Sequence, residues 1–202
     1  MRRLFALLLL LLGTSVLADE NAWIQEAYHK AAIHEQIENY SNAIKSILPV
    51  LRAYPSGYTV NLRLGWFYYL MGHYANSIAH YNVAIKMAPS AIEPKIGLLL
   101  PQLAQERYSE VEQTAYKILK SDFYSYYGNL RLSVALRKLK KTELALKVVN
   151  KMLILYPTDV TFLVEMGLLY QQSGEKEKAK AVFKNVIILD AENVTAKTYL
   201  DK

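Results

Sequence analysis

Apolar residues along most of the chain recur with the spacing of amphipathic helices, and this helical pattern itself repeats at a fixed interval. Residues 58–91 show it best, with one apolar stripe from Leu62 to Leu70 and a second from Ile78 to Ile85. Each stripe predicts a helix of about 12–14 residues with one buried side. The period predicts five such helix pairs, at residues 24–57, 58–91, 92–125, 126–159 and 160–193, followed by a short cap at 194–202.

Helix-breaking residues follow the same period. Pro55 and Pro89 are one period apart, and Gly72 and Gly174 are separated by three periods. One helix pair cannot bury its own apolar side, so neighbouring pairs must stack. A fixed period of about 34 residues therefore predicts an all-α solenoid of stacked repeats.

Particular residues within the period indicate a family. The second unit carries Leu64, Gly65, Tyr68, Gly72, Tyr74, Tyr81, Ala84 and Pro89, and the fifth carries Met166, Gly167, Tyr170, Gly174, Ala179 and Phe183. With these residues the chain resembles the tetratricopeptide repeat (TPR) family over nearly all of residues 19–202. The resemblance implies a right-handed superhelical α-solenoid of five helix-turn-helix units.

The third unit departs most from this pattern. Leu99 and Val111 replace small residues, Phe123 replaces the closing proline, and Pro101 falls in mid-helix. A proline inside a helix costs about 3 kcal/mol when nothing compensates. We therefore expect the third unit to be the weakest match to the family.

Residues 1–18 have the pattern of a secretory signal peptide. Arg2 and Arg3 precede an apolar run from Leu4 to Leu12, and Ala18 precedes an expected cleavage site. The alternative is an uncleaved anchor, although the apolar run is far shorter than a membrane-spanning helix. The sequence thus predicts a protein exported across the inner membrane and residing in the periplasm, with no membrane span after cleavage.

Composition narrows the chemistry. The chain has no cysteine, which excludes disulfides, thiolate catalysis and a lipoprotein anchor. The sequence shows no phosphate-binding loop, nucleophile elbow or metalloprotease motif. His29, His34, His73 and His80 lack carboxylates at metal-ligand spacing. We expect no catalytic residue, no cofactor, no metal site and no enzymatic activity.

The positive charge is concentrated in the fourth unit. The whole chain carries a net charge of +6, and residues 126–159 contain seven basic residues against two acidic ones. Arg137, Lys138, Lys140 and Lys141 lie around the predicted turn of this unit. They form either a solvated turn or a docking patch for an anionic partner.

The resemblance also implies a concave groove lined by the first helix of each unit. Carried over residue by residue, the candidate protein-binding positions are Tyr28, Leu62, Trp66, Tyr69, Leu70, Ile96, Leu100, Leu130, Val134 and Arg137. Trp66 and Tyr69 are the best anchors, because Trp, Tyr and Arg dominate binding hot spots. The alternative for Leu62, Ile96 and Leu130 is packing between neighbouring units. The lysine and asparagine clamp that some relatives use for a terminal carboxylate is absent.

Two functions remain open. The first is a non-enzymatic scaffold of a Gram-negative cell envelope that holds a helical or extended segment of another protein in its apolar groove. The second is a polysaccharide-binding or export accessory that uses the basic fourth unit and the aromatic segment Phe123–Tyr127. An exported chain is not expected to bind nucleic acid. Asn193 can cap a short final helix, which covers the last apolar face unless another chain does so.

Overall fold

The computed structural model describes residues 22–201. The predicted signal peptide lies outside the described residues. The described part of the chain consists of helices joined by short turns and contains no strand. None of the helices in this part is long and apolar enough to cross a membrane.

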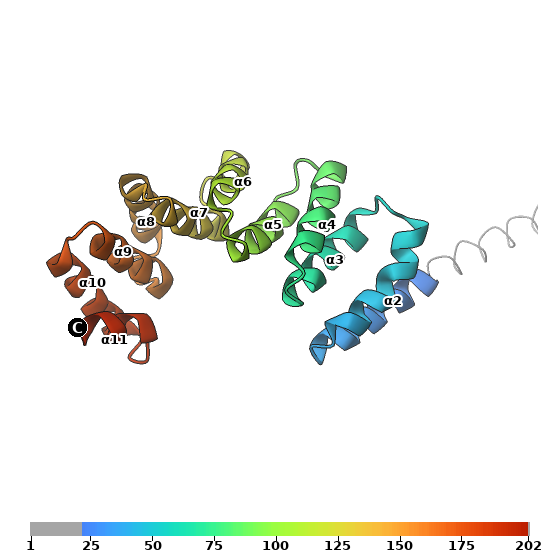
Figure 1. Ribbon diagram of the computed structural model, residues 1–202, viewed down its shortest axis with the longest axis horizontal. Helices are drawn as coiled ribbons and strands as arrows, with labels where there is room; N and C mark the ends of the chain where they lie inside the picture. The colour runs from blue at the N-terminus through green and yellow to red at the C-terminus, as the bar shows by residue number, and fades with distance from the viewer. Residues whose placement is uncertain (1–21, 202) are drawn as a thin grey trace, which may run out of the picture. The chain divides into compact units, whose positions relative to one another are not determined.

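Helices follow one another in pairs along the chain (Figure 1). The first pair consists of a helix whose described part is residues 22–36 and α2 (Tyr40–Ala53). The remaining pairs are α3 (Tyr58–Leu70) with α4 (Tyr74–Met87), α5 (Glu93–Ala104) with α6 (Tyr108–Ser121), α7 (Tyr126–Lys138) with α8 (Thr142–Leu155), and α9 (Val160–Gln172) with α10 (Lys176–Leu189); α11 (Val194–Leu200) follows. The second helices begin one sequence period apart, so the period is the spacing of the helix pairs. We number these pairs as repeats one to five.

The chain divides into two compact units between the second and third repeats. The N-terminal unit ends at Pro89 and the C-terminal unit begins at Ser90. The core of the N-terminal unit is built around Ile47, Leu64 and Phe67. The C-terminal unit buries one cluster between repeats three and five and a second cluster around Phe183. Within each unit, consecutive helices pack against each other, as a solenoid requires.

A size-matched pair of side chains lies where the two helices of a repeat cross. A Cβ atom placed on Gly65 would lie 2.8 Å from the Tyr81 ring, and one placed on Gly167 would lie 2.6 Å from the Phe183 ring. Glycine is therefore required there because a large ring fills the space from the opposite helix. The third repeat reverses the arrangement. Leu99 occupies the glycine position and Ala115 occupies the ring position, and both are fully buried in one core cluster.

Leu99 departs from the family pattern, as the sequence predicts, yet this departure does not leave the crossing of the third repeat poorly packed. The large residue is compensated by a small one on the opposite helix, because the volume between the helices is filled from the other side. Pro101 is also accommodated. Helix α5 runs through Pro101 and ends within one further turn, at Ala104.

The turn inside every repeat contains one residue in the left-handed conformation. These residues are Glu38, Gly72, Glu106, Lys140 and Gly174, with φ values between 56° and 80°. In the second repeat, the N–H groups of Gly72 and His73 reach back to the carbonyls of Tyr69 and Tyr68, at 2.9 and 2.8 Å. This is the usual way to satisfy carbonyl groups at a helix end. The corresponding turn residue in repeat four is Lys140, whose φ is also positive.

The short helix expected after Asn193 is α11. The Asn193 side chain accepts a hydrogen bond from the N–H of Ala196 at 3.0 Å. Ala196 is fully buried, and Tyr199 stacks on Phe183 with ring centroids 5.0 Å apart. Helix α11 thus covers part of the apolar surface of repeat five.

Size matching at the crossing predicts a coupled pair of substitutions. Gly167→Ala should lower the free energy of unfolding by about 1–3 kcal/mol, because the added methyl group overlaps the Phe183 ring. Phe183→Ile should also destabilise the protein, because it leaves a cavity. The double variant copies the Ala31 and Ile47 pair of repeat one, so its loss should be at least about 1 kcal/mol smaller than the sum of the single losses. Urea unfolding measures all three variants, and strictly additive losses would contradict size matching.

Candidate functional site

Helix α3 carries the predicted anchors of the N-terminal unit. Leu62, Trp66, Tyr69 and Leu70 are spaced so that they share one side of the helix, and all four are partly buried. The rings of Trp66 and Tyr69 stack with centroids 5.7 Å apart, and Tyr74 lies beyond Tyr69 at 6.0 Å. We call the side formed by Leu62, Trp66, Tyr69 and Leu70 the Trp66 face.

Trp66 is held in place by the preceding repeat. Its indole N–H donates to Glu35 Oε1 at 2.9 Å. The other carboxylate oxygen of Glu35 accepts a hydrogen bond from Arg63. Glu35 therefore bridges two side chains of α3, and the Trp66 ring has one fixed orientation. Sequence reasoning did not find the role of Arg63, since no local pattern links it to a carboxylate in the preceding repeat.

Tyr28 lies in different surroundings. It lines a cavity of about 260 Å³ together with residues that include Tyr54 and Tyr58. Burial raises the pKa of its phenol, while the nearby charge of Arg63 opposes the rise. The structure thus places Tyr28 between the first two repeats rather than within the Trp66 face.

In the C-terminal unit, the first helices α5, α7 and α9 lie next to one another. Ile96 and Leu130 pack against the core cluster, in line with the packing alternative for these residues. Leu100 and Val134 are also partly buried. Arg131 of α7 donates a hydrogen bond to the carbonyl oxygen of Ile96 at 2.6 Å and so links α7 to α5. These apolar side chains therefore form a rigid row along the first helices.

The predicted binding residue Arg137 has a structural partner. Its guanidinium donates from Nε and Nη2 to the two oxygens of Glu165, at 2.7 and 3.1 Å. Only 4% of Glu165 is exposed. The Arg137 carbonyl also accepts a hydrogen bond from Gln172 at 3.1 Å. Arg137 therefore ties α7 to α9 and does not present an unpaired charge to a ligand.

The other three residues of the predicted anionic-partner patch, Lys138, Lys140 and Lys141, differ in whether they have a partner. Lys141 donates to both oxygens of Glu112, at 2.9 and 2.7 Å. Lys138 lies 6.0 Å from the Tyr108 ring centroid, and Lys140 is the exposed turn residue of repeat four. Two of the four basic side chains are thus neutralised within the protein, so the patch has less free charge than its sequence indicated.

The aromatic segment Phe123–Tyr127 is partly structural. Tyr126 packs edge-on against Phe162 at 5.3 Å and donates a hydrogen bond to Asp159 at 2.9 Å. Phe123, Tyr124 and Tyr127 each remain more than half exposed. The segment thus both fills the joint between repeats and leaves three rings at the surface.

The histidines show no metal centre. Within residues 22–201, no three His, Cys, Asp or Glu side chains are grouped so that they could hold a metal ion. His80 instead shares a 2.9 Å hydrogen bond with Asn61 and stacks on Tyr68 at 5.3 Å. Burial lowers its pKa below the ordinary value of 6.5.

Comparison with known proteins decides the family. Models of the tetratricopeptide repeat match residues 28–92 and residues 160–193. The chain belongs to the tetratricopeptide repeat family. The third and fourth repeats lie between the two matched segments, where Leu99, Phe123 and the basic turn depart from the usual pattern. Tetratricopeptide repeats are in general non-enzymatic scaffolds for protein interaction, and the fold supports this general role for the chain.

Solved structures share the TPR fold at low sequence identity. A MamA structure matches with a TM-score of 0.75 and 14% identity, and covers 85% of this chain and 94% of its own. A TPR protein from Parabacteroides merdae matches with a TM-score of 0.81 and 13% identity over 89% of this chain and 71% of its own. A thermophilic TPR protein from Thermus thermophilus matches with a TM-score of 0.66 and 12% identity over 88% and 97%. No curated protein matches the TPR chain.

The buried ion pair predicts a stability role for Arg137. Arg137→Ala should lower the free energy of unfolding of the TPR protein by about 3 kcal/mol, because it leaves the Glu165 carboxylate buried without its partner. Arg137→Met combined with Glu165→Met should recover most of the loss. Lys140→Ala is the control and should change stability by less than about 0.5 kcal/mol. Unchanged stability of Arg137→Ala in urea unfolding would show that the ion pair is not structural.

His80 predicts a loss of stability in mild acid. Its folded-state pKa lies below the unfolded value of 6.5, so its contribution is fully present above pH 6.5 and is lost as the pH falls toward the folded pKa. His80→Gln removes the titrating group. Thermal unfolding from pH 7.5 downward should therefore show a steeper initial decline for the wild type than for the variant. Parallel curves would contradict this assignment.

Proposed function

We propose that this TPR protein is a non-enzymatic scaffold of a bacterial cell envelope, and that it holds a helical or extended segment of another protein on the Trp66 face. Export rests on the signal-peptide pattern of residues 1–18. The protein partner rests on the family and on the chemistry of the first-helix surface. The bound segment supplies apolar side chains, because the Trp66 face is aromatic and aliphatic.

The fixed indole of Trp66 is the observation that carries the proposal. Its single hydrogen-bond donor already reaches Glu35, so the remaining ring surface can bury a partner without leaving a polar atom unsatisfied. Tyr69 holds the ring from one side. A side chain that is already ordered loses little conformational entropy on binding. An aromatic residue in this condition is a favourable hot spot.

The neighbouring side chains suit a segment bound along the helix. Leu62 and Leu70 flank Trp66 at a spacing of one turn on each side. A helical partner presents side chains at i, i+3, i+4 and i+7, which matches the length of such a row. The polysaccharide alternative has less support, since Arg137 and Lys141 already pair with Glu165 and Glu112.

Site-specific photocrosslinking tests the proposal. Benzoylphenylalanine is placed at Leu70, beside the anchors, and in a separate variant at Met87, which is 51% exposed at the end of α4. Irradiation of intact producing cells should give an adduct with one defined protein from position 70 and not from position 87. The adduct should be recovered in the periplasmic fraction.

The same experiment includes variants of the anchors. Trp66→Ala and Tyr69→Ala, each combined with the probe at Leu70, should lower the adduct yield at least tenfold. Circular dichroism checks that each variant remains helical. Equal adducts from positions 70 and 87, or an adduct unaffected by both anchor substitutions, would overturn the assignment of the Trp66 face. An adduct found only in the cytoplasm would overturn the envelope location.

A further inference from the structure

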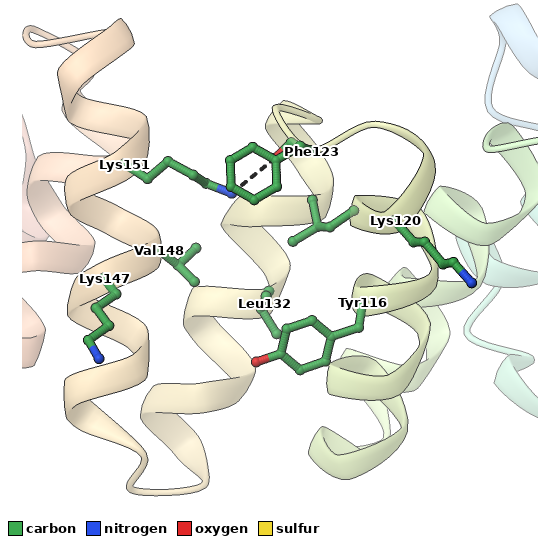
Figure 2. A pocket seen from close by; sticks show the side chains of 8 residues that line it. Tyr116, Lys120, Phe123, Leu132, Lys147, Val148 and Lys151 are labelled. Carbon is green, nitrogen blue, oxygen red and sulfur yellow. Dashed lines mark hydrogen bonds between the residues drawn. The ribbon is translucent and has the colours of Figure 1, made fainter.

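A pocket of about 430 Å³ opens between the second helices α6 and α8 of the C-terminal unit. Figure 2 shows it with α7 behind, from which Leu132 forms part of the floor. Leu119 and Val148 extend the apolar floor, and Tyr116 and Phe123 form two aromatic walls. The volume lies within the range of sites that take small molecules. Its residues belong mainly to second helices and a loop, so the pocket is separate from the Trp66 face and does not depend on the proposed function.

Comparison of repeats two and four explains the space. Asn61 donates through Nδ2 to the carbonyls of Pro55 and Gly57. Two periods later, Asn129 donates in the same way to the carbonyls of Phe123 and Ser125. The two asparagines thus hold the same position in the fold.

The residue facing the asparagine differs between these repeats. His80 shares a hydrogen bond with Asn61 Oδ1 and stacks on Tyr68. Two periods later, these positions hold Val148 and Leu136, which are smaller. The pocket therefore lies beside a position where repeat two has an imidazole ring.

The same replacement leaves a buried acceptor unused. Asn129 is fully buried, and its Oδ1 atom has no hydrogen-bond partner within the described part of the chain. The valine at position 148 cannot donate as His80 does in repeat two. A buried acceptor without a partner is costly, and only a donor such as a water molecule or an imidazole N–H can satisfy it; a carboxylate cannot.

The rim of the pocket is basic. Lys120, Lys147 and Lys151 line it, and no carboxylate of residues 22–201 does. Lys151 donates to the Phe123 carbonyl at 3.0 Å and lies 3.9 Å from the Phe123 ring centroid. Its ammonium has further donors to offer. Burial lowers the pKa of Lys151, and a bound anion would oppose that shift.

The other two lysines act at longer range. In Figure 2, Lys120 and Lys147 extend away from the centre of the pocket, whereas Lys151 points toward Phe123. Among the described residues, neither Lys120 nor Lys147 forms an ion pair. Their charges raise the local potential and attract anions to the opening.

We propose that this pocket binds a small organic anion with an apolar body, of the class of medium-chain or aromatic monocarboxylates. The apolar body contacts Leu119, Leu132 and Val148 between the Tyr116 and Phe123 rings. The carboxylate pairs with Lys151 at the rim. An apolar floor with one partly desolvated cation selects for this combination over a neutral lipid and over a small hydrophilic anion.

Calorimetric titration of the full chain with octanoate tests the site, with acetate and 1-octanol as controls. Octanoate should bind at least tenfold more tightly than either control, because it alone has both the apolar body and the charge. Lys151→Met should weaken octanoate binding at least tenfold and leave 1-octanol within about twofold. Lys138→Met, a loss of charge in the same repeat outside the pocket, should leave both affinities unchanged.

Val148→His provides a variant that fills the pocket without damaging the fold. It copies His80 and supplies the donor that Asn129 lacks, so the thermal unfolding temperature should be kept or raised while octanoate binding is lost. Equal binding of octanoate and 1-octanol, full octanoate binding by Val148→His, or no binding of octanoate to the wild type would each overturn the proposal. A loss of octanoate binding in Lys138→Met equal to that in Lys151→Met would also overturn it.

Discussion

In repeats two, three and five, the two helices cross where one large and one small side chain share a fixed volume. Gly65 with Tyr81, Gly167 with Phe183 and Leu99 with Ala115 are three solutions to the same constraint. Because interiors are packed to a nearly constant density, a change on one helix requires the opposite change on the other. The close crossing makes each helix pair a compact element that can stack on the next pair of the same unit, so each unit forms largely from short-range contacts.

Polar side chains on the first helices link neighbouring repeats through hydrogen bonds and ion pairs. Glu35 holds Trp66 and Arg63, while Glu165 holds Arg137. Each of these links joins one repeat to the next within a unit. These polar links therefore set the register of neighbouring helices, and they keep the apolar rows of the first helices ordered.

Repetition also makes small departures informative. Repeats two and four share the asparagine that bonds to the preceding loop. In repeat two His80 bonds to it, and in repeat four Val148 occupies the position of His80. Two smaller side chains, Val148 and Leu136, take the places of His80 and Tyr68, and a pocket and an unused acceptor lie beside them. A solenoid can acquire a small-molecule site in this way without altering its stacking, since each repeat contacts only its neighbours.

The sequence alone determined the helix pairs, their regular spacing and the family, because periodic burial and turn residues such as Gly72 act locally. It also named Trp66 and Tyr69, whose side of α3 follows from their spacing. Only the tertiary structure decided that Leu99 is matched by Ala115, that Arg137 is paired with Glu165, and that Lys151 stands over a pocket beside Val148. These facts depend on which side chains meet across different helices. Residue spacing within one helix does not determine which side chains of another helix it contacts. The matching of volumes and charges between helices is therefore set by the tertiary packing.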